Sequence, residues 1–128
     1  MKWSYFLNYK SELASKVIWH LKKLKSEDIE VESIRLDNAG ENVVLPALAI
    51  KEGFNINFEF TAPNSPQQNG VIEHAFAALT NRGRAMLNGA RLDDQVKPTL
   101  WAECFNTPTL IDNITLNVAT NSTPYELF

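Results

Sequence analysis

The stretch FNINFEF, residues 54–60, indicates the fold class of this chain. Its apolar side chains alternate with polar ones: Phe54, Ile56, Phe58 and Phe60. A period of two residues is typical of a β-strand with one buried face. The preceding residues 43–52 suit a short helix, in which Pro46 fits only the first turn and Gly53 caps the end. The sequence therefore predicts a helix followed directly by a strand, an order typical of α/β proteins.

Two further strands and another helix are predicted upstream of this stretch. Residues 29–37 alternate between apolar and polar side chains and end at the loop 38–40, so they suit a strand. Residues 3–9 are rich in aromatic side chains, which also favours a strand. Between these strands, Ser11 suits the N-cap of a helix with an apolar stripe that comprises Leu13, Val17, Leu21 and Leu24.

Downstream, the pattern predicts a polar loop at residues 67–70 and a long helix over 71–88. The side of this helix expected to be buried comprises Ile72, Phe76, Leu79, Gly83, Met86 and Leu87. Gly83 marks either a close approach of another element or a cost of about 1 kcal/mol relative to alanine. A charged connector at 90–98 leads to a last helix around 101–111, which Pro108 is expected to kink or split.

Composition limits the class of protein. The chain has 128 residues, of which 45% are hydrophobic and 21% charged, so we expect one globular domain over residues 1–128. Cys104 is the only cysteine, which excludes a disulfide scaffold and indicates a reducing compartment. No apolar run reaches the roughly eighteen residues that span a membrane, so no membrane partner is expected. The formal net charge of −3 argues against a protein whose whole surface binds nucleic acid.

Asp37 and Glu73 are the candidate metal ligands. Asp37 follows a predicted strand, and ligands collect at the carboxyl ends of parallel strands. Taken alone, Asp37 is typical of a turn, and Glu73 of a residue that interacts with the positive end of a helix. The alternative is that both carboxylates hold one cation. Their separation of 35 residues does not decide between these interpretations, because chance predicts about one acidic pair at that spacing.

Seven segments of the chain resemble the catalytic core of copia-type retrotransposon integrases. Three surround the two carboxylates: RLDNAGE (35–41), TAP (61–63) and SPQQNGVIE (65–73). Four more keep the family's order along the chain: KSE (10–12), LWAE (100–103), NT (106–107) and TPYEL (123–127). The resemblance extends over nearly the whole chain, and the combination of segments is specific where no single segment is.

The resemblance implies an RNase H-like α/β fold, with a mixed sheet flanked by helices, and DNA integration by metal-dependent strand transfer. Asp37 and Glu73 fall on two of the family's three acidic positions, which hold Mg²⁺ or Mn²⁺. In such a site one ion activates the attacking oxygen and the other stabilises the leaving oxygen at phosphorus. The implied partner is double-stranded DNA, as element ends and target. Action in the nucleus and assembly as a homo-oligomer are further implications of the family.

The chain also departs from the family's pattern. The family's first aspartate lies on a strand before the one that corresponds to residues 3–9, so we expect an N-terminally truncated core that lacks the first strand. Glu12 and Glu41 are poor substitutes for the missing carboxylate. Leu36 and Ala39 replace the usual Ser and Gly, and His74 replaces a commonly basic Arg. Strand transfer is expected to be impaired, because two carboxylates bind a metal pair weakly.

Candidate DNA contacts lie around the two carboxylates: Asn38, Gln67, Gln68, Asn69, Gly70, His74 and Arg84. Residues 67–70 match the family's mobile loop, where amides contact DNA and glycine allows movement. The alternative is that the amides solvate a turn and the basic side chains form a solvated helix face. Two other functions stay open: a non-catalytic nucleic-acid-binding remnant of a transposable element, and an RNase H-like nuclease that cuts without joining.

Overall fold

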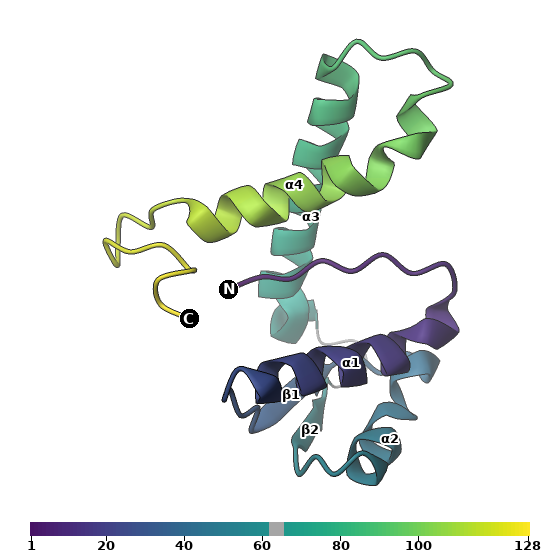
Figure 1. Ribbon diagram of the computed structural model, residues 1–128, viewed down its shortest axis with the longest axis vertical. Helices are drawn as coiled ribbons and strands as arrows, with labels where there is room; N and C mark the ends of the chain where they lie inside the picture. The colour runs from purple at the N-terminus through teal and green to yellow at the C-terminus, as the bar shows by residue number, and fades with distance from the viewer. Residues whose placement is uncertain (62–65) are drawn as a thin grey trace. The chain divides into compact units, whose positions relative to one another are not determined.

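The computed structural model describes residues 1–61 and 66–128, and for residues 66–69 it describes the backbone alone. The chain divides into two compact parts (Figure 1). The sheet unit is Leu7–Gly70, and the helical unit is Met1–Phe6 together with Val71–Phe128. Among the described residues, every helix is too short or too polar to cross a membrane.

The sheet unit is a small α/β layer. Its elements, in chain order, are η1 (Lys10–Glu12), α1 (Leu13–Ser26), β1 (Ser33–Leu36), η2 (Gly40–Asn42), α2 (Leu45–Lys51) and β2 (Asn57–Phe60). β1 and β2 are parallel, in a register that pairs Ser33 with Asn57 and Leu36 with Phe60. A parallel pair needs a crossover connection, which η2 and α2 supply. The predicted α/β class is confirmed at this level.

One face of the β1–β2 sheet packs on α1 and α2. The buried core residues come from these helices: Ala14, Ile18, Leu21, Leu45 and Ala49. Alternate strand residues pack against them: Ile34, Leu36 and Phe58. On the opposite, exposed face the Arg35 guanidinium donates hydrogen bonds of 2.8 and 3.1 Å to the Glu59 carboxylate. The alternation in the sequence therefore corresponds to one buried and one solvated face.

The end of α2 agrees with the prediction. Pro46 lies in the first turn, and Gly53 follows the helix with a φ of 79°. The N–H of Gly53 donates to the carbonyl of Ile50 (3.0 Å), and that of Phe54 to the carbonyl of Ala49 (2.9 Å). This pair of bonds satisfies the last carbonyls of the helix and requires a left-handed residue, which glycine adopts without strain. The cap fixes the direction in which the chain leaves α2.

The stripe that α1 buries is displaced from the predicted one. Ser11 lies within η1 and does not cap the helix. Leu13 and Val17 are only half-buried. The buried residues are Ala14, Ile18, Leu21 and Leu24. The prediction is right for the last two turns and wrong for the first two, because the side of the helix one residue further along faces the core.

The strands are shorter than predicted. Pairing begins at the carbonyl of Glu32, which accepts the N–H of Asn57 (2.9 Å). It ends where the carbonyl of Leu36 accepts the N–H of Thr61 (2.9 Å). Residues 29–31 and 54–56 were expected in strands, but they lie before the paired region and line a pocket described below. Alternation marks which residues share a face, whereas strand length depends on where two segments run side by side.

The strand predicted at residues 3–9 is wrong, because residues 1–7 form no regular element. The backbone of Lys2, at the start of this segment, binds the Asn113 side chain of the last helix, α4 (Trp101–Ile114). The Oδ1 atom of Asn113 accepts the N–H of Lys2 (2.8 Å), and its Nδ2 donates to the carbonyl of Lys2 (2.7 Å). The Phe6 and Trp101 rings also meet edge to face, with centroids 5.1 Å apart. A strand needs a ladder partner, and at Lys2 the Asn113 amide satisfies the backbone groups that such a partner would bind.

An ionic cluster joins the same segment to the helices. The Asp112 carboxylate of α4 accepts from the Lys2 ammonium (2.7 Å) and also binds the Arg82 guanidinium. Burial acts to raise the pKa of Asp112, but the hydrogen bonds from Lys2 and Arg82 outweigh it and hold this pKa below its ordinary value. Asp112 therefore stays ionised and bridges two basic side chains that are far apart in the sequence.

The long helix, α3 (Pro66–Gly89), begins earlier than predicted. The polar loop expected at residues 67–70 is wrong, because these residues form the first turns of the helix. Proline suits the first helical position, since its fixed φ is helical and its missing N–H has no helical partner there. Gly70 therefore lies in a helix, and the expectation that it gives a loop its flexibility is also wrong.

Only part of the predicted buried side of α3 is buried. Gly83 is buried, and Leu79 and Leu87 are half-buried. Ile72 and Phe76 are exposed at 59% and 71%, and Met86 at 37%, against expectation. The periodicity correctly groups these residues on one side, but it carries no information about which turns another element covers.

Gly83 is the point of close approach between α3 and α4. A Cβ added at Gly83 would lie 3.0 Å from Cγ of Phe105 and 3.1 Å from the carbonyl oxygen of Cys104. α4, which follows η3 (Lys97–Thr99), runs unbroken through Pro108, so the predicted split is wrong. Because proline has no N–H, the Cys104 carbonyl lacks the bond that residue 108 donates in a regular helix. The close approach predicted at Gly83 is confirmed.

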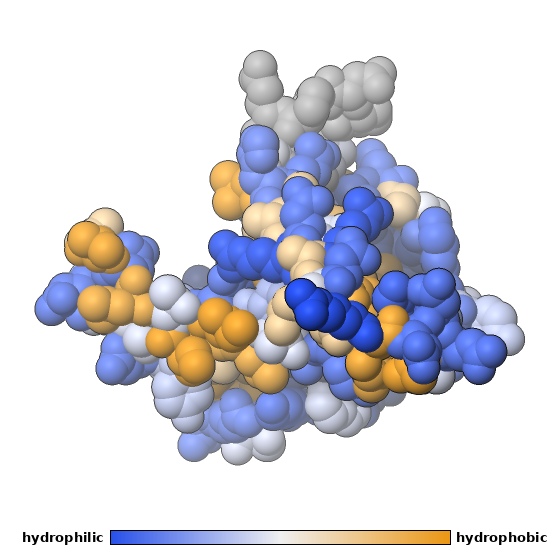
Figure 2. All heavy atoms as spheres, turned by 90° about the horizontal axis from the view of Figure 1, so that it is seen from above, coloured by the Kyte–Doolittle hydropathy of each residue, from blue (hydrophilic) through white to orange (hydrophobic). Residues whose placement is uncertain are grey.

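α4 presents a polar side inward and an apolar side outward. Thr109 and Asn113 are buried, and the Thr109 hydroxyl bonds that of Ser4 at 2.5 Å. Exposed apolar residues on α4 and in the segment after it are Leu110, Ile111, Ile114, Leu116 and Val118. Figure 2 shows apolar patches of this kind among polar residues. The buried residues of this helix therefore include two polar side chains beside Pro108, while several apolar side chains stay exposed.

Candidate functional site

Asp37 lies directly after Leu36, the last residue of β1, as predicted. Its side chain is exposed. The Oδ1 atom accepts the N–H of Ala39 (3.4 Å) and the Nδ2 of Asn42, which also donates to the Asp37 carbonyl (3.3 Å). Among the described residues, Oδ2 has no hydrogen-bond partner. One carboxylate oxygen is thus used to order the turn, and the other is accessible to a ligand.

The neighbouring side chains join the carboxyl ends of the two strands. Asn38 is exposed, and its Nδ2 donates to the carbonyl of Thr61 at 3.4 Å. Thr61 follows the last residue of β2. Glu41 pairs with Lys10 at 3.6 Å, in a pair whose lysine is largely solvated. The polar residues at this end of the sheet are therefore ordered by hydrogen bonds, and an exposed ion pair of this kind adds little stability.

Asn42 is the residue that sequence reasoning missed. It is buried, and its amide nitrogen donates to Oδ1 of Asp37, which orients that carboxylate, and to the Asp37 backbone carbonyl. In the sequence it is one more polar residue in a turn-forming stretch. No pattern distinguishes it, because its role depends on where η2 places its side chain.

Glu73, His74 and Arg84 all lie on α3 in the helical unit and are exposed. Within the described residues, these three side chains have no hydrogen-bond or ion-pair partner. Arg82 is different, because Asp112 occupies its guanidinium. Glu73 and Arg84 are therefore available to ligands as far as their surroundings are described.

The other candidate DNA contacts, residues 67–70, are only partly described by the structure. The side chains of Gln67, Gln68 and Asn69 lie outside the described part of the structure, although their backbone is helical. In the part of the chain that the structure describes, no atom lies within 4 Å of a Cβ added at Gly70.

The two candidate metal ligands belong to different units. Asp37 is part of the sheet unit and Glu73 part of the helical unit, and each is placed within its own unit. Among the described residues, no group of three or more His, Cys, Asp or Glu side chains is suited to hold a metal ion. A comparison with models of known protein families gives no match for this chain.

Proposed function

We propose that this chain is an integrase-like core with an RNase H-like fold, which acts on DNA by metal-dependent strand transfer with impaired activity. The observation that carries the proposal is the position of Asp37, one residue beyond a strand of a parallel pair. Catalytic and binding residues collect at that end of α/β sheets. The segments RLDNAGE and SPQQNGVIE, which resemble copia-type integrases, add the second carboxylate, Glu73.

The donor chemistry of the two carboxylates fits a hard divalent cation. Among the described residues Asp37 keeps one unpaired carboxylate oxygen, and the bond from Asn42 to the other restricts its orientation. Glu73 is exposed and unpaired among the described residues. Asp37 and Glu73 would hold Mg²⁺ or Mn²⁺, which when bound activates an oxygen nucleophile and offsets charge on a phosphate.

Exposed polar and basic side chains support a DNA partner. His74 and Arg84 share α3 with Glu73, and Asn38 follows Asp37. The guanidinium of Arg84 is unpaired among the described residues, so a phosphate would not have to displace another carboxylate. Contacts of this kind position DNA without reading its sequence.

A second candidate, a non-catalytic nucleic-acid-binding remnant, is favoured by one specific observation. Asp37 already orders its own turn through Ala39 and Asn42, which is a complete structural role. Among the described residues, Asp37 also belongs to no group of three or more His, Cys, Asp or Glu side chains that suits a metal ion. This candidate predicts DNA affinity that falls steeply with salt and is independent of Mg²⁺ or Mn²⁺.

Strand transfer in Mn²⁺ tests the proposal. A labelled donor duplex should yield a small amount of joined product, and Asp37→Asn and Glu73→Gln should each remove it. Glu32→Gln is the matched control, because Glu32 is an exposed carboxylate just before the same strand, β1. DNA binding without any product would support the remnant, and cleavage without joining would support a nuclease unrelated to integration.

A paramagnetic titration tests the shared ion separately from activity. Bound Mn²⁺ broadens amide NMR signals near it, so residues around Asp37 and around Glu73 should broaden together. Asp37→Asn should then abolish the broadening on α3 as well as at the end of β1. Broadening at one carboxylate that is unaffected by substitution of the other would refute a shared site.

A further inference from the structure

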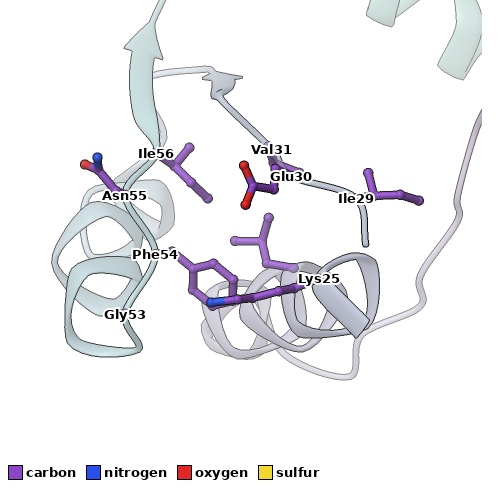
Figure 3. Close-up of a pocket in the computed structure, with 9 residues that line it drawn as sticks. Lys25, Ile29, Glu30, Val31, Gly53, Phe54, Asn55 and Ile56 are labelled. Carbon is purple, nitrogen blue, oxygen red and sulfur yellow. The ribbon is translucent and has the colours of Figure 1, made fainter. Parts of the chain in front are cut away.

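A pocket of about 300 Å³ lies in the sheet unit, before the paired part of the strands (Figure 3). The residues that line it come from α1 and from the segments leading into β1 and β2: Leu21, Lys25, Ile29, Glu30, Val31, Gly53, Phe54, Asn55 and Ile56. Since Asp37 follows the opposite end of β1, this pocket is separate from the candidate metal site.

Backbone hydrogen bonds hold both walls of the pocket. On one side the N–H of Ile29 donates to the carbonyl of Leu24 (3.0 Å), after Asp28 with a φ of 59°. On the other side the left-handed Gly53 and the bond from Phe54 to Ala49 fix the start of the second segment. Two helix ends therefore set the width of the pocket before any ligand binds, which lowers the ordering cost of binding.

The pocket combines partly buried apolar walls with two exposed charged residues, Lys25 and Glu30. Leu21 is buried, and the Phe54 and Ile56 side chains are half-buried. The Lys25 ammonium lies 5.6 Å from the centroid of the Phe54 ring. Figure 3 shows the Glu30 carboxylate directed into the pocket. Within the described residues, neither Lys25 nor Glu30 forms an ion pair.

We propose that this pocket binds a free α-amino acid with an apolar side chain. Its carboxylate would pair with Lys25 and its ammonium with Glu30, while its side chain packs against Leu21 and Phe54. A simple cation meets repulsion from Lys25, a simple anion meets repulsion from Glu30, and a neutral apolar molecule pairs with neither of these exposed charges. A zwitterion with an apolar body avoids all three costs.

The size of the pocket agrees with such a ligand. A volume of about 300 Å³ is at the lower end of small-molecule sites. A single amino acid fits this volume, whereas a nucleotide needs a larger site and an excess of positive charge.

Titration of the full chain with L-phenylalanine, followed by amide NMR spectra, tests the proposal. Saturable shifts are expected at residues 25–31 and 53–56. Three analogues each remove one recognised group: 2-phenylethylamine lacks the carboxylate, 3-phenylpropanoate lacks the ammonium, and glycine lacks the apolar side chain. Each should bind at least about tenfold more weakly, because a lost charge-assisted hydrogen bond, or for glycine the lost burial of an apolar side chain, costs roughly that factor or more.

Substitutions assign the two charges. Glu30→Gln should weaken phenylalanine binding about tenfold without weakening the binding of 3-phenylpropanoate. Lys25→Met should weaken phenylalanine binding about tenfold without weakening the binding of 2-phenylethylamine. Glu32→Gln is the matched control and should leave the affinities for all three compounds unchanged. Absence of saturable shifts, equal binding of all four compounds, or shifts confined to other residues would overturn the proposal. Asp37→Asn should leave phenylalanine binding intact, which separates this result from that of the strand-transfer assay.

Discussion

Replacing Gly83 with alanine perturbs the contact between α3 and α4 by a single methyl group. That methyl carbon would lie 3.0 Å from Cγ of Phe105 and 3.1 Å from the carbonyl oxygen of Cys104. Carbon atoms in good contact lie about 3.5–4.0 Å apart, so the overlap with the ring is about 0.5 Å or more. The carbonyl belongs to the α4 backbone and moves only if the helix moves. Overpacking of this kind costs about 1–3 kcal/mol.

Helix propensity acts in the opposite direction. Alanine in a helix interior is about 1 kcal/mol more favourable than glycine. Gly83→Ala should therefore lower the free energy of unfolding by about 0–2 kcal/mol. Gly70→Ala is the matched control in the same helix, because nothing lies within 4 Å of a Cβ there. It should raise the free energy of unfolding by about 0.5–1 kcal/mol.

Urea unfolding followed by far-UV circular dichroism measures both variants. The free energies of unfolding of the two variants should differ by about 1–3 kcal/mol, with Gly83→Ala the less stable variant. Adding Phe105→Leu to Gly83→Ala should recover part of the loss, because it removes the ring and leaves the carbonyl in place. If Gly83→Ala stabilises the protein as much as Gly70→Ala, the close approach of α3 and α4 is refuted.

Three further substitutions test individual interactions. Asn113→Ala leaves both backbone groups of Lys2 without their partner, so urea unfolding should show a loss of about 1–3 kcal/mol; an unchanged midpoint would contradict this role. Because its partners lower the pKa of Asp112 in the folded chain, their stabilisation is complete above the unfolded-state value of about 3.9 and is lost as pH falls through the lower, folded value. The thermal midpoint should decline in that acidic range, and Asp112→Asn should flatten the decline. Gly53→Ala should lower the free energy of unfolding by about 1–2 kcal/mol, because Gly53 has a φ of 79°. Gly40→Ala is the control and should not lower it, because Gly40 has no positive φ.

Local sequence patterns predicted the features that depend on neighbouring residues and not on tertiary contacts. The Gly53 cap and the alternation at 54–60 are local signals, and both are present in the structure. The strand expected at 3–9 failed because strand formation depends on a partner strand, and just before these residues the backbone of Lys2 binds the Asn113 side chain instead. Ile72 and Phe76 share a helix face as predicted, yet their burial depends on what packs there.

The candidate site was predictable to a similar degree. Asp37 was expected at the end of a strand and lies there, because alternation before it and a glycine turn after it are visible in the sequence. The role of Asn42 could not be predicted, since η2 brings its amide to Asp37 only after folding. A loop that contacts DNA was expected at residues 67–70. These residues instead lie at the start of α3, because Pro66 suits the start of a helix as well as a loop.

The contact between Gly83 and the Cys104 carbonyl involves two residues that each lack a backbone or side-chain group, Gly83 and Pro108. Glycine provides space for the carbonyl by having no Cβ, and Pro108 cannot donate a hydrogen bond to that carbonyl because it has no N–H. In evolutionary terms the two residues should therefore vary together. A relative that gains a side chain at position 83 has less reason to keep proline at 108, and an engineer who regularises α4 should expect its attachment to α3 to weaken.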